Sequence, residues 1–116
     1  MDINRMILTL KGHPDYPKMG MIASHLGIVR ETSLNGGKVE GIEVEFDNSV
    51  ISNIISEIKQ MPGIIEVLVE TFGGRPRVGD ELMAVAVGGD TREHVFPALI
   101  DAVNRIKTEA TSKKEF

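Results

Sequence analysis

The chain has 116 residues, with 13 basic and 17 acidic side chains, three histidines and no cysteine. This length suits a single domain over residues 1–116, and the lack of cysteine excludes disulfides, thiolate metal sites and a cysteine nucleophile. The formal net charge of −4 argues against binding to nucleic acid or to an anionic membrane surface.

No apolar run approaches the roughly 20 residues that a membrane-spanning helix needs. The first ten residues include Asp2, Asn4 and Arg5 and contain no small-residue cleavage site, so they do not form a secretory signal. We therefore expect a cytoplasmic protein without a membrane segment.

Alternating apolar and polar residues and a high content of β-branched side chains predict five strands. In chain order these are Arg5–Lys11, Met21–Arg30, Lys38–Phe46, Ile64–Phe72 and Leu82–Val87. Asn35-Gly36-Gly37 predicts a hairpin turn between the second and third strands, because both residue types tolerate a positive φ. The run from Met83 to Val87 carries no charge, which indicates a strand covered on both faces.

Two segments show the periodicity of an amphipathic helix. The first extends from Ser49 to Met61, is capped by Asp47, Asn48 or Ser49, and ends at Pro62-Gly63. The second is capped by Asp90 or Thr91 and reaches Ile106, with Pro97 predicting a kink or a later start. A cationic polar tail over 107–116 follows. This order predicts an α+β fold in which two main helices pack on a mixed, largely antiparallel sheet.

The segment from Val87 to Arg92 can bind an anion. A buried strand leads into two glycines, a cap residue and a helix start, so that consecutive N–H groups can converge beside the Arg92 guanidinium. The alternative is a tight turn that needs glycine for its geometry and leaves Arg92 in solvent. No Gly-Lys-Ser/Thr follows the glycines, so nucleotide hydrolysis is disfavoured.

The second cationic feature lies at the C-terminal end of the chain. Lys107 and Lys114 are seven residues apart and share one face if the second helix continues that far. A lysine beside other cations loses its proton more easily, which suits a nucleophile or a general base. The alternative is that these lysines only complement the helix dipole and keep the tail soluble. The histidines lack ligand spacing, so no metal site is predicted.

The co-linear order of three motifs resembles the large, catalytic subunit of molybdopterin synthase. These motifs are Gly27-Ile28-Val29-Arg30, Val78-Gly79-Asp80-Glu81 and the Lys107–Lys114 spacing, and the resemblance covers about residues 21–115. It implies an α/β hammerhead-type fold and a homodimer that forms a heterotetramer with a small ubiquitin-like sulfur carrier ending in Gly-Gly. It further implies transfer of sulfur from the carrier's thiocarboxylate to cyclic pyranopterin monophosphate, in molybdenum cofactor biosynthesis, without a cofactor.

The resemblance also assigns site residues. Lys107 becomes the essential catalytic lysine, supported by Lys114, which also helps to bind the substrate and the carrier's tail. The implied substrate-binding set consists of Ile28, Val29, Arg30, Thr91, Arg92, Lys114 and Glu115. Both reactants are anions, which agrees with cations at these positions.

Several departures from the family surround this site. Thr91-Arg92 and Thr71-Phe72 stand where the family has two His-Arg pairs. The segment from Thr111 to Glu115 lacks the family's Pro and Trp, and the further C-terminal segment of the family does not follow Phe116. An alternative that fits these departures is a divergent short paralogue. Such a protein would be a catalytically weak or inactive homodimer that binds a pterin, a phosphate ligand or a carrier tail. A ferredoxin-like regulatory domain is a third reading, but it does not account for the lysine spacing.

Overall fold

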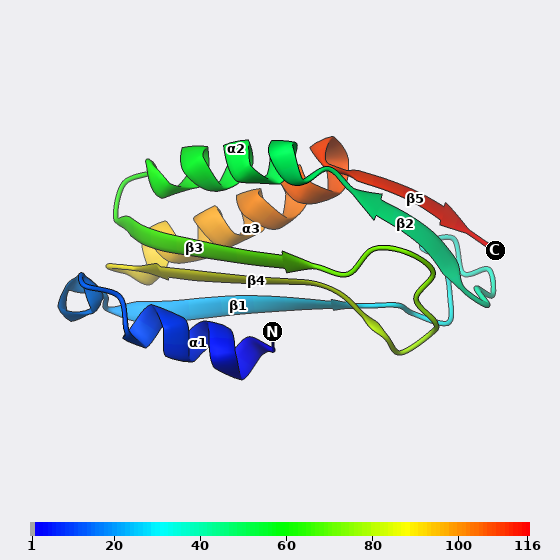
Figure 1. Ribbon diagram of the computed structural model, residues 1–116, viewed down its shortest axis with the longest axis horizontal. Helices are drawn as coiled ribbons and strands as arrows, with labels where there is room; N and C mark the ends of the chain where they lie inside the picture. The colour runs from blue at the N-terminus through cyan, green and yellow to red at the C-terminus, as the bar shows by residue number, and fades with distance from the viewer. Residues whose placement is uncertain (1) are drawn as a thin grey trace.

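The computed structural model describes residues 2–116 as two antiparallel sheets with helices on both sides of the larger one (Figure 1). The larger sheet has the strand order β1-β4-β3, and the smaller sheet pairs β2 with β5. The strands are β1 (Met21–Ile28), β2 (Ile42–Phe46), β3 (Ile64–Thr71), β4 (Glu81–Gly89) and β5 (Thr111–Glu115). The helices are α1 (Ile3–Lys11), α2 (Asn48–Lys59) and α3 (Arg92–Glu109), with a short 3-10 turn at Tyr16–Lys18. The predicted α+β class is confirmed.

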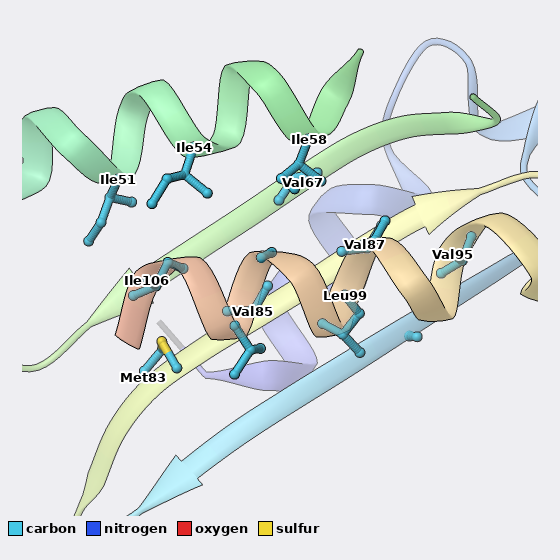
Figure 2. Close-up of a cluster of buried hydrophobic side chains, with 14 of the residues drawn as sticks. Ile51, Ile54, Ile58, Val67, Met83, Val85, Val87, Val95, Leu99 and Ile106 are labelled. Atoms are coloured by element: carbon cyan, nitrogen blue, oxygen red, sulfur yellow. The ribbon is translucent and has the colours of Figure 1, made fainter. Parts of the chain in front are cut away.

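Strand β4 is the centre of the molecule because both of its faces are covered, as its uncharged sequence predicts. Val85 and Val87 point toward α2 and α3 and belong to the main core. Ala84 and Ala86 point the other way and pack against α1. Figure 2 shows the main core, where isoleucines of α2 and α3 lie over Val67, Val85 and Val87. All of Met83–Val87 is buried, so β4 fixes where the helices can lie.

The first predicted strand is wrong, because Arg5–Lys11 lies within helix α1. Met6 and Leu10 are four residues apart and both fully buried, which is the spacing of a helical face. The Asp2 carboxylate caps this helix by accepting a hydrogen bond from the Arg5 N–H at 2.8 Å. The alternation that suggested a strand is thus part of a short helical stripe.

The predicted pairing of the second and third strands is also wrong. The turn at Asn35–Gly37 closes only a local bridge between Thr32 and Lys38, whereas β1 pairs with β4 and β2 pairs with β5. Both strands are shorter than predicted, ending at Ile28 and starting at Ile42. The turn signal was correct locally, but the partners of long strands are chosen by burial across the whole fold.

The C-terminal residues form a strand rather than a tail. Helix α3 begins at Arg92, passes Pro97 and ends at Glu109, so the later start suggested by Pro97 is wrong. Strand β5 then pairs with β2, and Phe116 continues this pairing through hydrogen bonds with Gly41. Lys107 and Lys114 therefore do not share a helical face.

Helix α3 runs back along the sheet, antiparallel to β4 (Figure 1). Its first turn lies at the end of β4, where Val95 packs against Gly89. Its last turn lies beside the start of α2, where the Ala110 carbonyl accepts a hydrogen bond from the Asp47 N–H at 2.8 Å. The helix thus spans the molecule from one end of the larger sheet to the junction with the smaller one.

Gly63 lies against the start of α3, so a substitution there tests how much this contact contributes to stability. It has a φ of +78°, its carbonyl accepts the Asp90 N–H at 2.9 Å, and a Cβ built on it overlaps the side chains of Asp90 and His94. We expect Gly63→Ala to lower the free energy of unfolding by at least about 2 kcal/mol, through backbone strain and this overlap. Urea unfolding measures the loss.

Gly36 is the matched control, because its φ is +85° and no atom lies within 4 Å of its ideal Cβ. Gly36→Ala should cost only the backbone term, about 1 kcal/mol. Equal losses for the two variants would show that Gly63 has no special role in seating the start of α3.

Candidate functional site

The structure places the predicted site residues at two opposite ends of α3. Arg30, Lys107 and Lys114 lie toward the junction of the two sheets, and we call this group the lysine end. Thr91 and Arg92 lie at the start of α3, and we call this group the arginine end. Both ends can be followed along α3 in Figure 1, from yellow at Arg92 to orange-red at Glu109.

The segment Ile28–Arg30 joins the lysine end to the smaller sheet. Val29 is buried in a separate apolar cluster with Val39, Ile42 and Val44. Its N–H donates to the Asp80 carbonyl at 2.9 Å, and its carbonyl accepts from the Gly79 N–H at 2.8 Å. Burial of Val29 leaves Ile28 and Arg30 exposed on either side of it, as expected for an extended segment.

Arg105 fixes the last turn of α3, which carries Lys107. Its guanidinium contacts Glu57 of α2 at 2.6 Å and Glu109 at 2.8 Å. Hydrogen bonds to Glu109 and Glu57 raise the pKa of Arg105, and the guanidinium in turn lowers the pKa of Glu109. Both ion pairs of Arg105 are made within the fold, so its charge stabilises the structure and is not available to a ligand.

The three cations of the lysine end differ from Arg105 in their lack of ion pairs with other described residues. Over residues 2–116, neither Arg30, Lys107 nor Lys114 forms an ion pair, and all three are exposed. By contrast, Lys59 binds Glu66 at 3.1 Å and Arg75 binds Glu43 at 3.5 Å. Arg5, Lys11, Lys38 and Arg77 are also exposed and have no ion pair among the described residues, so the lack of a partner does not by itself mark a site. Exposed cations without a carboxylate partner are nevertheless available to attract anions.

Lys114 and Glu115 lie on strand β5. Lys114 is opposite Glu43 of β2, so the two side chains share a face of the smaller sheet. Arg75, which pairs with Glu43, reaches the same face from the loop before β4. Glu115 is opposite Ile42 and points to the other face. The structure thus separates the two neighbouring residues of the predicted set.

The arginine end borders an open hollow of about 350 Å³. It is lined by Gly20, Met21, Asp90, Thr91, Arg92 and Glu93. The first N–H groups of α3 lie beside this hollow, and Arg92 is exposed, with Nε 3.5 Å from Glu93. Helix N-termini and guanidinium groups attract negative charge, but the Asp90 and Glu93 carboxylates line the same hollow, so the anion site at this end stays a prediction.

Asp90 and His94 form a pair at this end that the sequence analysis did not identify. Asp90 Oδ1 accepts the Thr91 N–H at 2.6 Å and lies 2.8 Å from His94 Nδ1. The His94 hydrogen bond is the main cause that lowers the pKa of Asp90. Thr91 is the N-cap residue, but its side chain makes no capping bond. The Asp-x-x-x-His spacing at a helix start was the available signal.

The two ends of α3 are too far apart to act on one small ligand within a single chain. Arg92 and Lys107 are fifteen residues apart on a continuous helix, which corresponds to about 22 Å along its axis. Within one chain, the site residues that the family resemblance implies are therefore divided between two separate ends of α3 and do not form a single pocket.

Comparison with known proteins gives the family of this fold. The sequence profile described as "MoaE protein" matches residues 1–109. The molybdopterin synthase catalytic subunit of Ralstonia nicotianae is 30% identical over 98 residues, which are 81% of this chain and 55% of that protein. The chain thus spans about half the length of this relative.

Solved structures agree with this result. Molybdopterin cofactor biosynthesis protein E from Burkholderia multivorans is 28% identical, with a TM-score of 0.80, over 99% of this chain and 80% of that one. Molybdopterin synthase from Staphylococcus aureus is 27% identical, with a TM-score of 0.73, over 85% of this chain and 75% of that one. The chain belongs to the MoaE protein family, the family of molybdopterin synthase catalytic subunits.

Two further properties concern the described residues only. Among residues 2–116, no helix has both the length and the apolar character required to cross a membrane. Within the same range, no three histidine or carboxylate side chains converge on a point where a metal ion could bind.

The Asp90–His94 pair makes stability depend on pH in the acid range. Because the folded pKa of Asp90 lies below its ordinary value, the unfolded chain binds the proton first as the pH falls, and the stabilisation is then lost. We expect Asp90→Asn to show a smaller loss of stability than the natural chain between about pH 5 and pH 2.5, measured by urea unfolding.

The control is Asp15→Asn, which removes an exposed carboxylate 3.6 Å from Lys18. Its pH profile should follow that of the natural chain. An Asp90→Asn profile parallel to the natural one would show that the pair contributes nothing to acid sensitivity.

Proposed function

We propose that this protein is the catalytic subunit of a molybdopterin synthase. It would transfer sulfur from the C-terminal thiocarboxylate of a small ubiquitin-like carrier, ending in Gly-Gly, to cyclic pyranopterin monophosphate. The observation that carries the proposal is the lysine end, where Arg30, Lys107 and Lys114 are exposed without ion pairs. A thiocarboxylate and a cyclic phosphate are both anions, which such a surface attracts.

Lys107 is the proposed catalytic residue. The carrier's sulfur bonds to a side-chain carbon of the pterin and displaces an oxygen substituent from it, which leaves the carrier joined to the pterin as a thioester. A water oxygen then bonds to the acyl carbon and the C–S bond breaks, so that the carrier leaves as a carboxylate and the sulfur stays on the pterin as a thiol or thiolate. An ammonium group near the acyl carbon can polarise the carbonyl, and it can donate a proton to the departing sulfur. The ion pairs of Arg105 with Glu57 and Glu109 support this role, because they hold the last turn of α3 in place.

The other members of the predicted set would bind the reactants. Arg30 and Arg92 offer guanidinium groups for the phosphate or the pterin, and Lys114 offers a second ammonium group for the substrate and the carrier tail. Ile28 would contribute its exposed backbone and side chain next to Arg30. Val29 would hold this segment in place, because it is buried and its N–H and carbonyl are hydrogen-bonded to Asp80 and Gly79. Thr91 would contribute its hydroxyl at the start of α3, and Glu115 would contact the carrier tail from the face of the smaller sheet opposite to Lys114.

We further propose that the working unit is a homodimer, which becomes a heterotetramer with two carriers. The separation of the lysine end from the arginine end supports this, because a second copy can bring its arginine end to the lysine end of the first. Phe96 and Ile100 also support it, since they are one helical turn apart on α3 and 49% and 60% exposed. A twofold contact along antiparallel α3 helices covers this stripe and joins opposite ends.

The alternative is a homodimer that binds a carrier tail, a pterin or another phosphate ligand with little or no turnover. Thr91 favours it, because a hydroxyl stands where the family has an imidazole. Binding of the carrier without formation of a dithiolene product would support this alternative. We expect turnover below that of a family member with His-Arg at this position.

The proposed role of Lys107 is tested by Lys107→Ala. Dithiolene formation from thiocarboxylated carrier and cyclic pyranopterin monophosphate should fall by about 100-fold or more, since the proton donor is lost. Carrier binding, measured by calorimetry, should change far less. Lys59→Ala is the control, because Lys59 also ends a helix but pairs with Glu66. A Lys107→Ala variant with natural turnover would refute the assignment.

The shared site is tested by mixing two inactive chains. In a dimer of one Arg92→Ala chain and one Lys107→Ala chain, one composite site keeps both residues and the other lacks both. Random pairing should therefore restore about a quarter of the natural activity. Differently tagged chains allow the mixed dimer to be purified and assayed. Absence of any recovery would place both residues in the same chain's site or in none.

A further inference from the structure

His25 lies on β1, on the face of the larger sheet that α2 and α3 cover. It is paired with Val85 in the β1–β4 register, and paired residues point to the same side. Val85 is fully buried in the main core, and Ala23, two residues before His25, belongs to the same core. The His25 ring extends along the strand toward Gly27, whose ideal Cβ would lie 3.5 Å from Nε2. The ring is therefore directed toward the lysine end.

The Nε2 atom of His25 is buried and has no hydrogen-bond partner among the described residues. Such an atom costs about 1–3 kcal/mol when it stays unpaired, so native structures rarely keep one without a reason. Strand neighbours on the same face are Ala23 and Gly27, and those on β4 are Met83, Val85 and Val87. None of these side chains can form a hydrogen bond of ordinary strength.

Lys107 lies on the last turn of α3, in the helical layer that covers this face of the sheet, and its positive charge acts on the His25 ring. It lies one turn after Val103, which packs in the main core, and helical side chains lean back toward the N-terminus. Burial and the positive charge of Lys107 together lower the pKa of His25, so its ring is neutral near pH 7. A neutral imidazole can accept a hydrogen bond, whereas an ammonium group can only donate.

We propose that His25 is a positioning residue for Lys107, whose ammonium group donates a hydrogen bond to His25 Nε2 when the carrier tail covers the lysine end. This inference rests on the proposed role of Lys107. In the free chain Lys107 is exposed, and a bound tail would remove water from around it. The bond would fix Nζ beside the acyl carbon and, because an acceptor favours the charged form, would keep the proton available for the departing sulfur.

The contact itself is tested without any turnover. The pKa of His25 is measured by NMR titration of the full chain labelled on histidine, alone and with carrier ending in a Gly-Gly carboxylate. Lys107→Met should raise this pKa by about half a pH unit or more, since a nearby positive charge is removed. Lys59→Met, on another helix, should leave it unchanged. An unchanged pKa in the Lys107→Met chain, with and without carrier, would overturn the proposal.

The positioning role is tested by kinetics on variants of His25. His25→Phe keeps a flat ring without nitrogen, and we expect kcat to fall about tenfold with KM changed less than about twofold. His25→Gln restores an acceptor near the Nε2 position and should recover most of kcat. Equal kcat for the natural and His25→Phe chains, or loss without recovery in His25→Gln, would contradict positioning. If the natural chain shows no turnover, the proposed function fails, and the NMR titration alone decides the contact.

Discussion

The length and direction of α3 are the constraint on which the rest of the site depends. Eighteen residues of helix run antiparallel to β4 and hold Arg92 and Lys107 at opposite ends. The helix cannot slide, because β4 is buried on both faces and α2 is tied to the last turn of α3 through Arg105 and Glu57. A rigid helix of this length keeps the two cationic ends apart within one chain, which is why the proposed shared site requires a second copy of the chain.

Some cations of the molecule form ion pairs that join parts of the fold, and others have no ion pair within the described part of the chain. Arg105, Lys59 and Arg75 each pair with a carboxylate, and each pairing connects different elements of the fold. Arg30, Lys107 and Lys114 lie close to these pairs along the chain or in space, but no carboxylate neutralises them. The proposed binding of two anionic reactants would account for three unpaired cations at this end of the molecule.

Local patterns in the sequence predicted most elements, and long-range choices explain the rest. The stripe of α2, the cap at Asp47 and the buried run in β4 were all readable, because each depends on neighbours within a few residues. The pairing of β2 with β5 was not, since Thr111–Glu115 is polar and becomes a strand only beside β2. Helix α1 was predicted as a strand because a segment of nine residues is too short for its apolar pattern to distinguish a helix from a strand.

The residues of the candidate site were likewise predictable where a local motif marks them and not where only the fold brings them together. Family spacing brought Arg30, Lys107 and Lys114 into one hypothesis, and topology does place them toward one end of the larger sheet. His25 was passed over, because a lone histidine in a strand has no motif and its meaning depends on what α3 carries above it. Thr91 stands where the family has an imidazole, but His94 still provides one at the arginine end, where it is paired with Asp90. His25 provides a second imidazole on the sheet face that α3 covers, and its buried Nε2 has no hydrogen-bond partner among the described residues. The two imidazoles therefore differ in that only His25 has a buried nitrogen still in need of a donor, which is why the proposed positioning role belongs to His25 and not to His94.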